Sequence, residues 1–360
     1  MKLTPIRVRG KGGKKTLWTA PDPQRILKRK RIDYAISDDS ESDAKRRRRL
    51  RTTKKPAAPI ELLPSEVLER ILFMSRNFNL LRSSSRIGYR FSSRSFLIGL
   101  VEDAFAPTWE VWFGCPRDQI SSYNGFLCDH DRIGGDYVVQ ENVLNFPWLN
   151  LPAILEAQQR WYRKHGTGRY FEHLVPLTSS VHSDSEPGHH PLGGPGHAMD
   201  VEACFEADWN EFTSAYSVLL SGDAAELNAI PRSFLHGKAY IDVHPITSIP
   251  DSLIRGPFDL QRAKLLFWLI RGGARLGQPS SWETAKCGYE NITALGDKRL
   301  AVHLLGLFHE LNVFHGFWPD FVREEKLAEA ERRYESADPM TLAGRLWWFA
   351  RELLKQSWRY

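Results

Sequence analysis

The stretch "IELLPSEVLERILFMSRNFNLLRSSSRIGYRFSSRSF" occupies positions 60–96 and decides how the front of the chain folds. Pro64 and Ser65 predict a helix start, because a serine side chain can cap the free N–H groups of a first turn. The pattern then predicts a break at "SRNFN" and a second short helix from Leu80 and Leu81. Apolar residues recur three and four positions apart, as in an amphipathic helix. They are Leu63, Val67, Leu68, Ile71 and Leu72.

The stretch is too short to build a large core. A module of this size tends to complete its core against a partner, for example by laying a helical face into a groove. The alternative is an ordinary pair of amphipathic helices that packs on the chain's own body.

The order of residues in this stretch resembles the F-box family, especially the variant common in fungal proteins. The resemblance rests on Leu63-Pro64-Ser65-Glu66-Val67-Leu68-Glu69-Arg70-Ile71-Leu72, then Leu80-Leu81, then Ser85-Arg86 and Tyr89. The second half departs from the family pattern. Ser84-Ser85 stand where a valine-cysteine pair is typical, and no tryptophan follows.

The resemblance implies a three-helix module that binds the Skp-type adaptor of a cullin-RING (SCF-type) ubiquitin ligase. The rest of the chain would then capture a protein substrate and hold it near a ubiquitin-carrying enzyme, which raises effective concentration without bond chemistry by this chain. The residues implied to meet the adaptor are Leu63, Pro64, Val67, Leu68, Ile71, Leu72, Leu80, Leu81 and Arg86.

Charge is divided unevenly along the chain. Residues 1–55 hold 19 Lys and Arg against 6 Asp and Glu, whereas the remainder holds 30 against 37. The acidic remainder argues against nucleic-acid binding there, because phosphate contacts need clustered basic side chains. Residues 1–57 are also poor in apolar side chains, so we predict a disordered basic tail.

Two basic clusters lie in this tail, on either side of the acidic spacer "SDDSESD". They are Lys28, Arg29, Lys30 and Arg31, and Lys45, Arg46, Arg47, Arg48 and Arg49. Paired clusters are typical of nuclear targeting, because an import carrier can clamp both across a flexible spacer. We expect a protein that is located in the nucleus, with the cytoplasm as an additional location. The alternative function is a nuclear scaffold or chromatin-associated protein whose tail contacts nucleic acid.

The fold class predicted for the chain is mainly α. After the F-box module at 58–106 we expect a helical, substrate-binding body at 107–360, with a flexible insertion at 179–200 and one small hairpin before 150. Helices are predicted at 151–164 and 201–220 and in the C-terminal "DPMTLAGRLWWFARELLKQSWRY". Phe205, Trp209, Phe212, Tyr216 and Leu219 form the stripe that we expect to be buried along the 201–220 helix. Trp347, Trp348 and Phe349 belong either to the core or to a substrate groove.

Two segments resemble the second helix of ankyrin repeats. They are "LLFWLIRGGARL", within the longer stretch 256–279, and "TALGDKRLAVHLL". Arg262 of the first stretch aligns with Arg299 of the second, and each precedes an apolar helix. The opening T-P-L-H-x-A of an ankyrin repeat is missing from both. We therefore expect an irregular helical body, with a degenerate ankyrin-like stack of helix pairs as the alternative.

Residue patterns for catalysis, metal binding and membrane insertion are weak. "CDHD" at 128–131 places neighbouring side chains that rarely all face one metal, and His182, His189, His190 and His197 lie in the predicted insertion. No nucleophile can be identified for a catalytic triad with His236, Asp242 and His244, so we expect an ordinary polar loop there. The stretch "GKGGKKT" lacks the spacing of a phosphate-binding loop. No apolar run approaches the ~20 residues of a membrane span, and no secretory signal is visible. We expect an intracellular protein that is not an enzyme and needs no cofactor.

Overall fold

The computed structural model describes residues 58–112, 134–146, 148–166, 200–221, 241–277, 282–314 and 318–356. The chain divides between Ala57 and Ala58, and all described residues belong to the second unit. They form thirteen α-helices, one 3-10 helix and no strand, which confirms the mainly-α class. The tail 1–57 with both basic clusters, and positions 179–199 of the insertion, lie outside the described residues.

The front of this unit is a group of short helices. They are η2 (Pro59–Leu62), α2 (Ser65–Ser75), α3 (Asn79–Ser83) and α4 (Ser85–Arg90). Helix α2 begins at Ser65, where the sequence predicts, but the expected serine cap is wrong, because Pro64 is the N-cap and no side chain caps the helix. Arg76 ends the helix with a left-handed backbone at φ 48°. The next helix, α5 (Arg94–Trp112), runs through the boundary predicted between 106 and 107. The short helices are thus joined to the body by a continuous helix.

Helices α7 (Tyr137–Leu144) and α8 (Leu151–His165) pack on α5. Asp136 caps the first through the backbone nitrogens of Val138 and Val139, and Asn150 caps the second. The helix predicted at 151–164 is confirmed. The predicted hairpin is not found in the described residues of 107–150, where the chain is helical apart from short connections.

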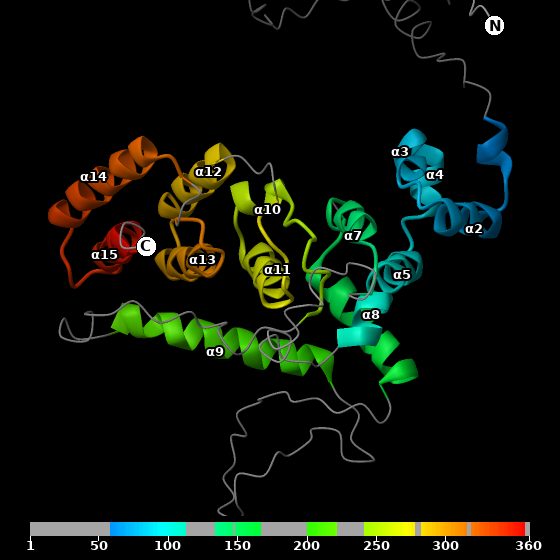
Figure 1. Cartoon of the computed structure of the whole chain (residues 1–360), viewed down its shortest axis with the longest axis horizontal. Coiled ribbons are helices and arrows are strands. Elements are labelled where there is room, and N and C mark those ends of the chain that lie inside the picture. The colour runs from blue at the N-terminus through cyan, green and yellow to red at the C-terminus, as the bar shows by residue number, and fades with distance from the viewer. Residues whose placement is uncertain are drawn as a thin grey trace, which may run out of the picture. The chain divides into compact units, whose positions relative to one another are not determined.

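The body continues as three successive helix pairs. They are α10 (Asp251–Arg255) with α11 (Leu260–Arg271), α12 (Trp282–Thr293) with α13 (Lys298–Glu310), and α14 (Asp320–Ser336) with α15 (Leu342–Gln356). Figure 1 shows the first helices of the pairs in one row and the second helices in another. Helix α13 packs against both α11 and α15. This part of the body is therefore a stack of successive helix pairs, which is the alternative left open by the sequence.

Helices α11 and α13 share the same end structures. Asp259 caps α11 and Asp297 caps α13, each through a side-chain oxygen. After the last turns, Gly273 (φ 96°) and Asn312 (φ 54°) adopt left-handed backbone, which glycine and asparagine tolerate best. When the two capping residues are aligned, Arg262 corresponds to Leu300, because each lies three residues after its cap. The alignment of Arg262 with Arg299 is therefore wrong by one residue.

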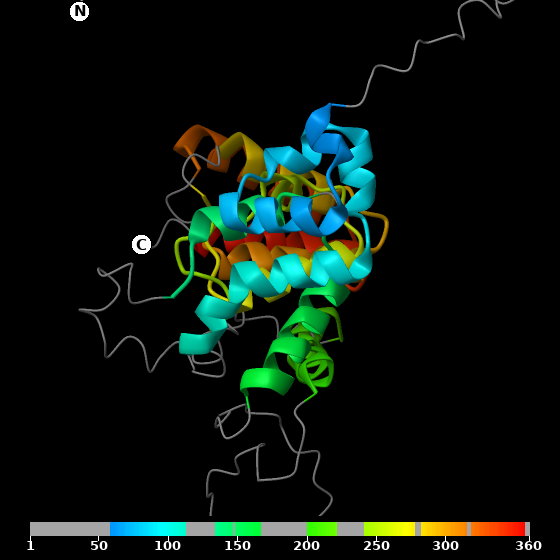
Figure 2. The same ribbon diagram turned by 90° about the vertical axis from the view of Figure 1, so that its right-hand side faces the viewer.

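Helix α9 (Val201–Ser221) lies along the row of second helices and contacts α8, α11, α13 and α15 (Figures 1 and 2). Its predicted stripe is buried, with every member at most 5% exposed. Phe267 of α11 meets both Trp209 and Phe212, with ring centroids 5.4 and 5.1 Å apart. One long helix thus ties the repeated pairs together by aromatic packing.

The aromatic residues of α15 belong mainly to the core. Phe349 is fully buried, and Trp347 and Trp348 are partly buried against the same core. The Arg333 guanidinium of α14 lies 5.8 Å from the Trp347 ring centre. Core packing therefore accounts for these side chains, and a substrate groove is not needed to explain them.

Candidate functional site

Helix α2 presents an apolar face to solvent. Val67 and Met74, seven positions apart, are 43% and 78% exposed, and Ile71 between them is partly exposed. Just before the helix, Leu62 is 68% exposed and Pro64 is exposed. Contiguous exposed apolar side chains commonly mark a protein-binding surface. We call Leu62, Pro64, Val67, Ile71 and Met74 the α2 face.

The opposite side of α2 is covered by the chain itself. Leu68 and Leu72 are at most 1% exposed and belong to the continuous core. Leu63, Leu80 and Leu81 are partly buried against that core. Leu68 and Leu72 therefore cannot meet a partner in this conformation, contrary to the full set implied by the resemblance. The small module completes its core within the chain.

Polar contacts fix the segment that precedes α2. The Glu61 carboxylate accepts hydrogen bonds from the backbone nitrogen of Ala58 and from the Ser84 hydroxyl. The Arg90 guanidinium donates to the carbonyl oxygen of Leu63 at 2.6 Å. Because Ser84 also caps α4 through the backbone nitrogen of Arg86, η2 is held against α4. The side chain of Arg86 itself is exposed.

Aromatic packing joins this module to the body. Phe78 meets Phe146 edge to face at 5.9 Å, and Phe146 stacks on Trp148 at 4.5 Å. The guanidinium of Arg82, on α3, lies over the Phe146 ring, 5.4 Å from the ring centre. The position of the α2 face is therefore set by the same core that supports the helix stack.

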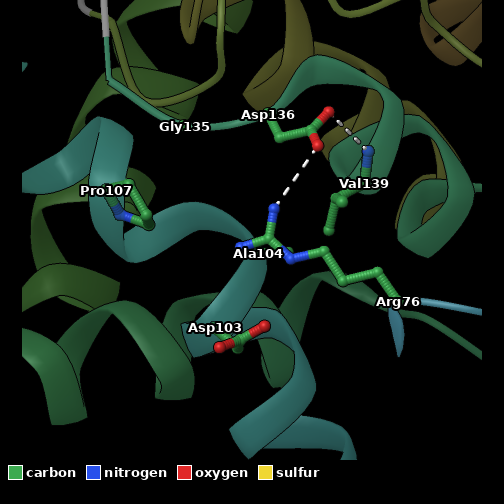
Figure 3. Close-up of a pocket in the computed structure, with 7 residues that line it drawn as sticks. All are labelled: Arg76, Asp103, Ala104, Pro107, Gly135, Asp136 and Val139. Atoms are coloured by element: carbon green, nitrogen blue, oxygen red, sulfur yellow. Dashed lines mark hydrogen bonds and ion pairs between the residues drawn. The ribbon is translucent and has the colours of Figure 1, made fainter. Parts of the chain in front are cut away.

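A recess of about 280 Å³ lies where α2, α5 and α7 meet. Figure 3 shows its lining, which combines two carboxylates, one guanidinium and small apolar groups. The lining residues are Arg76, Asp103, Ala104, Pro107, Gly135, Asp136 and Val139. Arg76 pairs with Asp136 at 3.3 Å, which connects the end of α2 to the start of α7.

Two glycines let the chain approach α5 beside this recess. Gly134 and Gly135 have φ values of 74° and 92°, which favour glycine. A Cβ on Gly135 would lie 2.6 Å from the Thr108 hydroxyl oxygen. That hydroxyl donates to the carbonyl oxygen of Gly134 at 2.8 Å, so close approach and hydrogen bonding occur together.

Gln140 lies behind the recess and uses its whole amide group. Its nitrogen donates to Thr108 and to the carbonyl oxygen of Ala104, at 2.9 and 3.2 Å. Its oxygen accepts from the His244 backbone nitrogen and the Thr247 hydroxyl, at 2.8 and 3.1 Å. A fully satisfied buried amide holds its neighbours in one arrangement, so the wall of the recess is fixed.

No known relative guides the interpretation of these features. No family model, no curated protein and no solved structure matches this chain.

Asp242 and His244, which the sequence suggests to be an ordinary polar loop, are buried. The Asp242 carboxylate pairs with Arg271 at 3.0 Å and accepts from Gln158 at 3.1 Å. Arg271 also pairs with Asp208 of α9. The acid is thus engaged by a guanidinium and an amide, an arrangement that supports the structure. His236 lies outside the described residues.

Within the described residues, no group of three or more His, Cys, Asp and Glu side chains is placed to hold a metal ion. The motif at 128–131 and His182, His189, His190 and His197 lie outside them. None of the described helices is both long and apolar enough to span a bilayer.

The sequence alone did not predict the recess or the contacts of Arg76 and Gln140 around it. Gly134-Gly135 before Asp136 was the available signal, since paired glycines mark close backbone approach. The partners of Arg76 and Gln140 lie far along the chain, and no local pattern identifies them.

Proposed function

We propose that this chain is an F-box-type adaptor that recruits a protein substrate to a cullin-RING ubiquitin ligase. The α2 face binds the Skp-type adaptor, and the helix stack captures the substrate. The chain supplies position and effective concentration, while bond chemistry is left to other subunits.

The observation that carries this proposal is the exposure of the α2 face. The segment 63–72, which resembles the F-box, leads into and forms most of helix α2, and Val67 and Met74 on that helix are open to solvent. Exposed apolar side chains on a rigid helix are suited to a groove in a partner, because little conformational entropy is lost on docking. Leu68 and Leu72 support this face from inside.

The test is calorimetric titration of the full-length chain with a purified Skp-type adaptor. We expect the wild type to bind and the double variant Val67→Glu, Met74→Glu to bind at least about tenfold more weakly, which is ~1.4 kcal/mol. Both side chains are exposed, so the variant should keep the fold, as circular dichroism and thermal unfolding would show.

A matched control changes exposed apolar residues elsewhere. Leu260 on α11 and Met340 before α15 are 50% and 64% exposed. The Leu260→Glu, Met340→Glu variant should bind the adaptor like the wild type. Absence of wild-type binding, or equal binding by the α2-face variant, would overturn the proposal.

The uneven charge favours a second proposal, on location and on nucleic acid. Residues 1–55 carry both basic clusters, which lie outside the described residues and suit recognition by an import carrier. Deleting residues 1–55 should abolish nuclear accumulation of a fluorescent fusion. If the tail instead acts as a nucleic-acid contact of a nuclear scaffold, the full chain should bind DNA with an affinity that falls steeply with salt, and the deletion should abolish it.

A further inference from the structure

The charged groups of the recess are not all paired. Asp136 is fully engaged, because one oxygen caps α7 at Val138 and Val139 and the other pairs with Arg76. Figure 3 shows the Arg76 guanidinium lying between the carboxylates of Asp136 and Asp103, with its hydrogen bond directed to Asp136. One positive charge thus faces two negative ones, and the recess carries a net charge of about −1.

Asp103 is the acid without a partner. Among the described residues, its carboxylate takes part in no hydrogen bond and no ion pair. It is exposed at the mouth of the recess, where desolvation raises its pKa although the nearby Arg76 lowers it. A partly desolvated carboxylate that makes no hydrogen bond or ion pair gains more from a second cation than a fully hydrated one does.

The rest of the lining is apolar and small. Ala104 and Val139 are buried, and Pro107 lies beside them on α5 (Figure 3). At about 280 Å³, the recess is slightly smaller than the ~300–1,000 Å³ typical of small-molecule sites. Its size suits one long side chain better than a whole ligand.

We propose that this recess binds a lysine or arginine side chain of a partner protein. The aliphatic stem of such a side chain packs on Pro107 and Val139, while its charged head reaches Asp103. Calling the partner a ligase substrate rests on the proposed function, but binding of the side chain itself does not.

The recess is already shaped for this occupant. Gln140 fixes the Ala104 carbonyl and the Thr108 hydroxyl behind it, and the half-exposed Arg76–Asp136 pair lies on one rim. A rigid site loses little entropy when it is filled. An anionic side chain is disfavoured, because the one guanidinium is already paired and two carboxylates face the space.

The test uses side-chain probes and the full chain without any ligase subunit. The probes are N-acetyl-lysine methylamide and its arginine, norleucine and glutamate analogues, followed by the ¹³C-methyl signals of Val139 and Ala104. We expect saturable shifts with lysine and arginine, with a Kd of about 1 mM or weaker, and none with norleucine or glutamate. Equal shifts with norleucine or glutamate, or no saturable shift with the cations, would overturn the proposal.

Variants separate charge from structure. Asp103→Asn removes the charge at nearly constant shape and should abolish the lysine-induced shifts, whereas Asp103→Glu should keep them in weaker form. Glu324→Gln removes an exposed carboxylate from α14 and should change nothing. Retained shifts in Asp103→Asn would exclude the recess as the site. Because the Skp-type adaptor is absent, failure here leaves the binding test of the α2 face unaffected.

Discussion

The side-chain oxygen of Gln140 accepts a hydrogen bond of 2.8 Å from the backbone nitrogen of His244. This bond joins α7 to the segment that leads into α10. The same amide reaches Ala104 and Thr108 on α5, so one side chain connects three parts of the chain. The region around the recess therefore depends on a single fully buried polar group.

Replacing Gln140 by methionine should destabilise the protein strongly. Methionine has a similar size but takes away the oxygen that accepts from the buried His244 nitrogen and from the Thr247 hydroxyl. Each buried unsatisfied group costs about 1–3 kcal/mol, so we expect a loss of at least about 2 kcal/mol in the free energy of unfolding. Urea unfolding measures it. Asn142→Met, on the exposed side of α7, is the control, and equal stability of the two variants would contradict the prediction.

The buried charges of α11 give a second prediction. Arg271 is 6% exposed and lies between Asp242 and Asp208. Arg271→Gln takes the guanidinium away from the buried Asp242 carboxylate and from the partly buried Asp208 carboxylate. Removing one partner of a buried pair typically costs about 3–5 kcal/mol. Thermal and urea unfolding should show this loss. Arg275→Gln, four residues on and exposed, should stay near wild-type stability, and a similarly small effect at Arg271 would show that the pair is dispensable.

The contacts of Gln140 and Arg271 show what the sequence alone cannot predict. Regular apolar spacing predicts α8, α9, α11 and α15, because a helix face must be buried whatever covers it. It does not tell which surface does so, and the F-box resemblance places Leu68 and Leu72 against a partner although the chain itself buries them. Asp242 and His244 look like a polar loop because their partners, Arg271 and Gln140, lie far along the chain.

The α2 face can be predicted from local sequence, whereas the recess cannot. Val67 and Met74 follow from helical spacing once the start of α2 is known. The recess combines Arg76, Asp103 and Asp136 from three helices, and only the tertiary structure brings them together. Local sequence can predict an exposed stripe but not a site assembled from separate elements.

His303 should make stability depend on pH. Desolvation at the interface with α9, beside Trp209 and Phe212, lowers its pKa below the ordinary value of 6.5. The unfolded chain then binds the proton more readily, so stability is present above about pH 6.5 and is lost as pH falls toward the folded pKa. Urea midpoints between about pH 8 and about pH 5 measure this. His303→Gln should flatten the slope, and an unchanged slope would assign it to other groups.

Ser84 supplies the last prediction, because it holds η2 and α4 together. Its hydroxyl oxygen accepts from the backbone nitrogen of Arg86 at 3.2 Å, and its hydroxyl donates to Glu61, whose pKa is lowered mainly by this bond. Ser84→Ala removes the cap, which typically contributes about 0.5–2 kcal/mol to helix stability. Amide hydrogen exchange of α4 should therefore become faster, and the pKa of Glu61 should rise toward its ordinary value. The neighbouring Ser85→Ala should leave both unchanged, and if it matched Ser84→Ala, α4 would not depend on this cap.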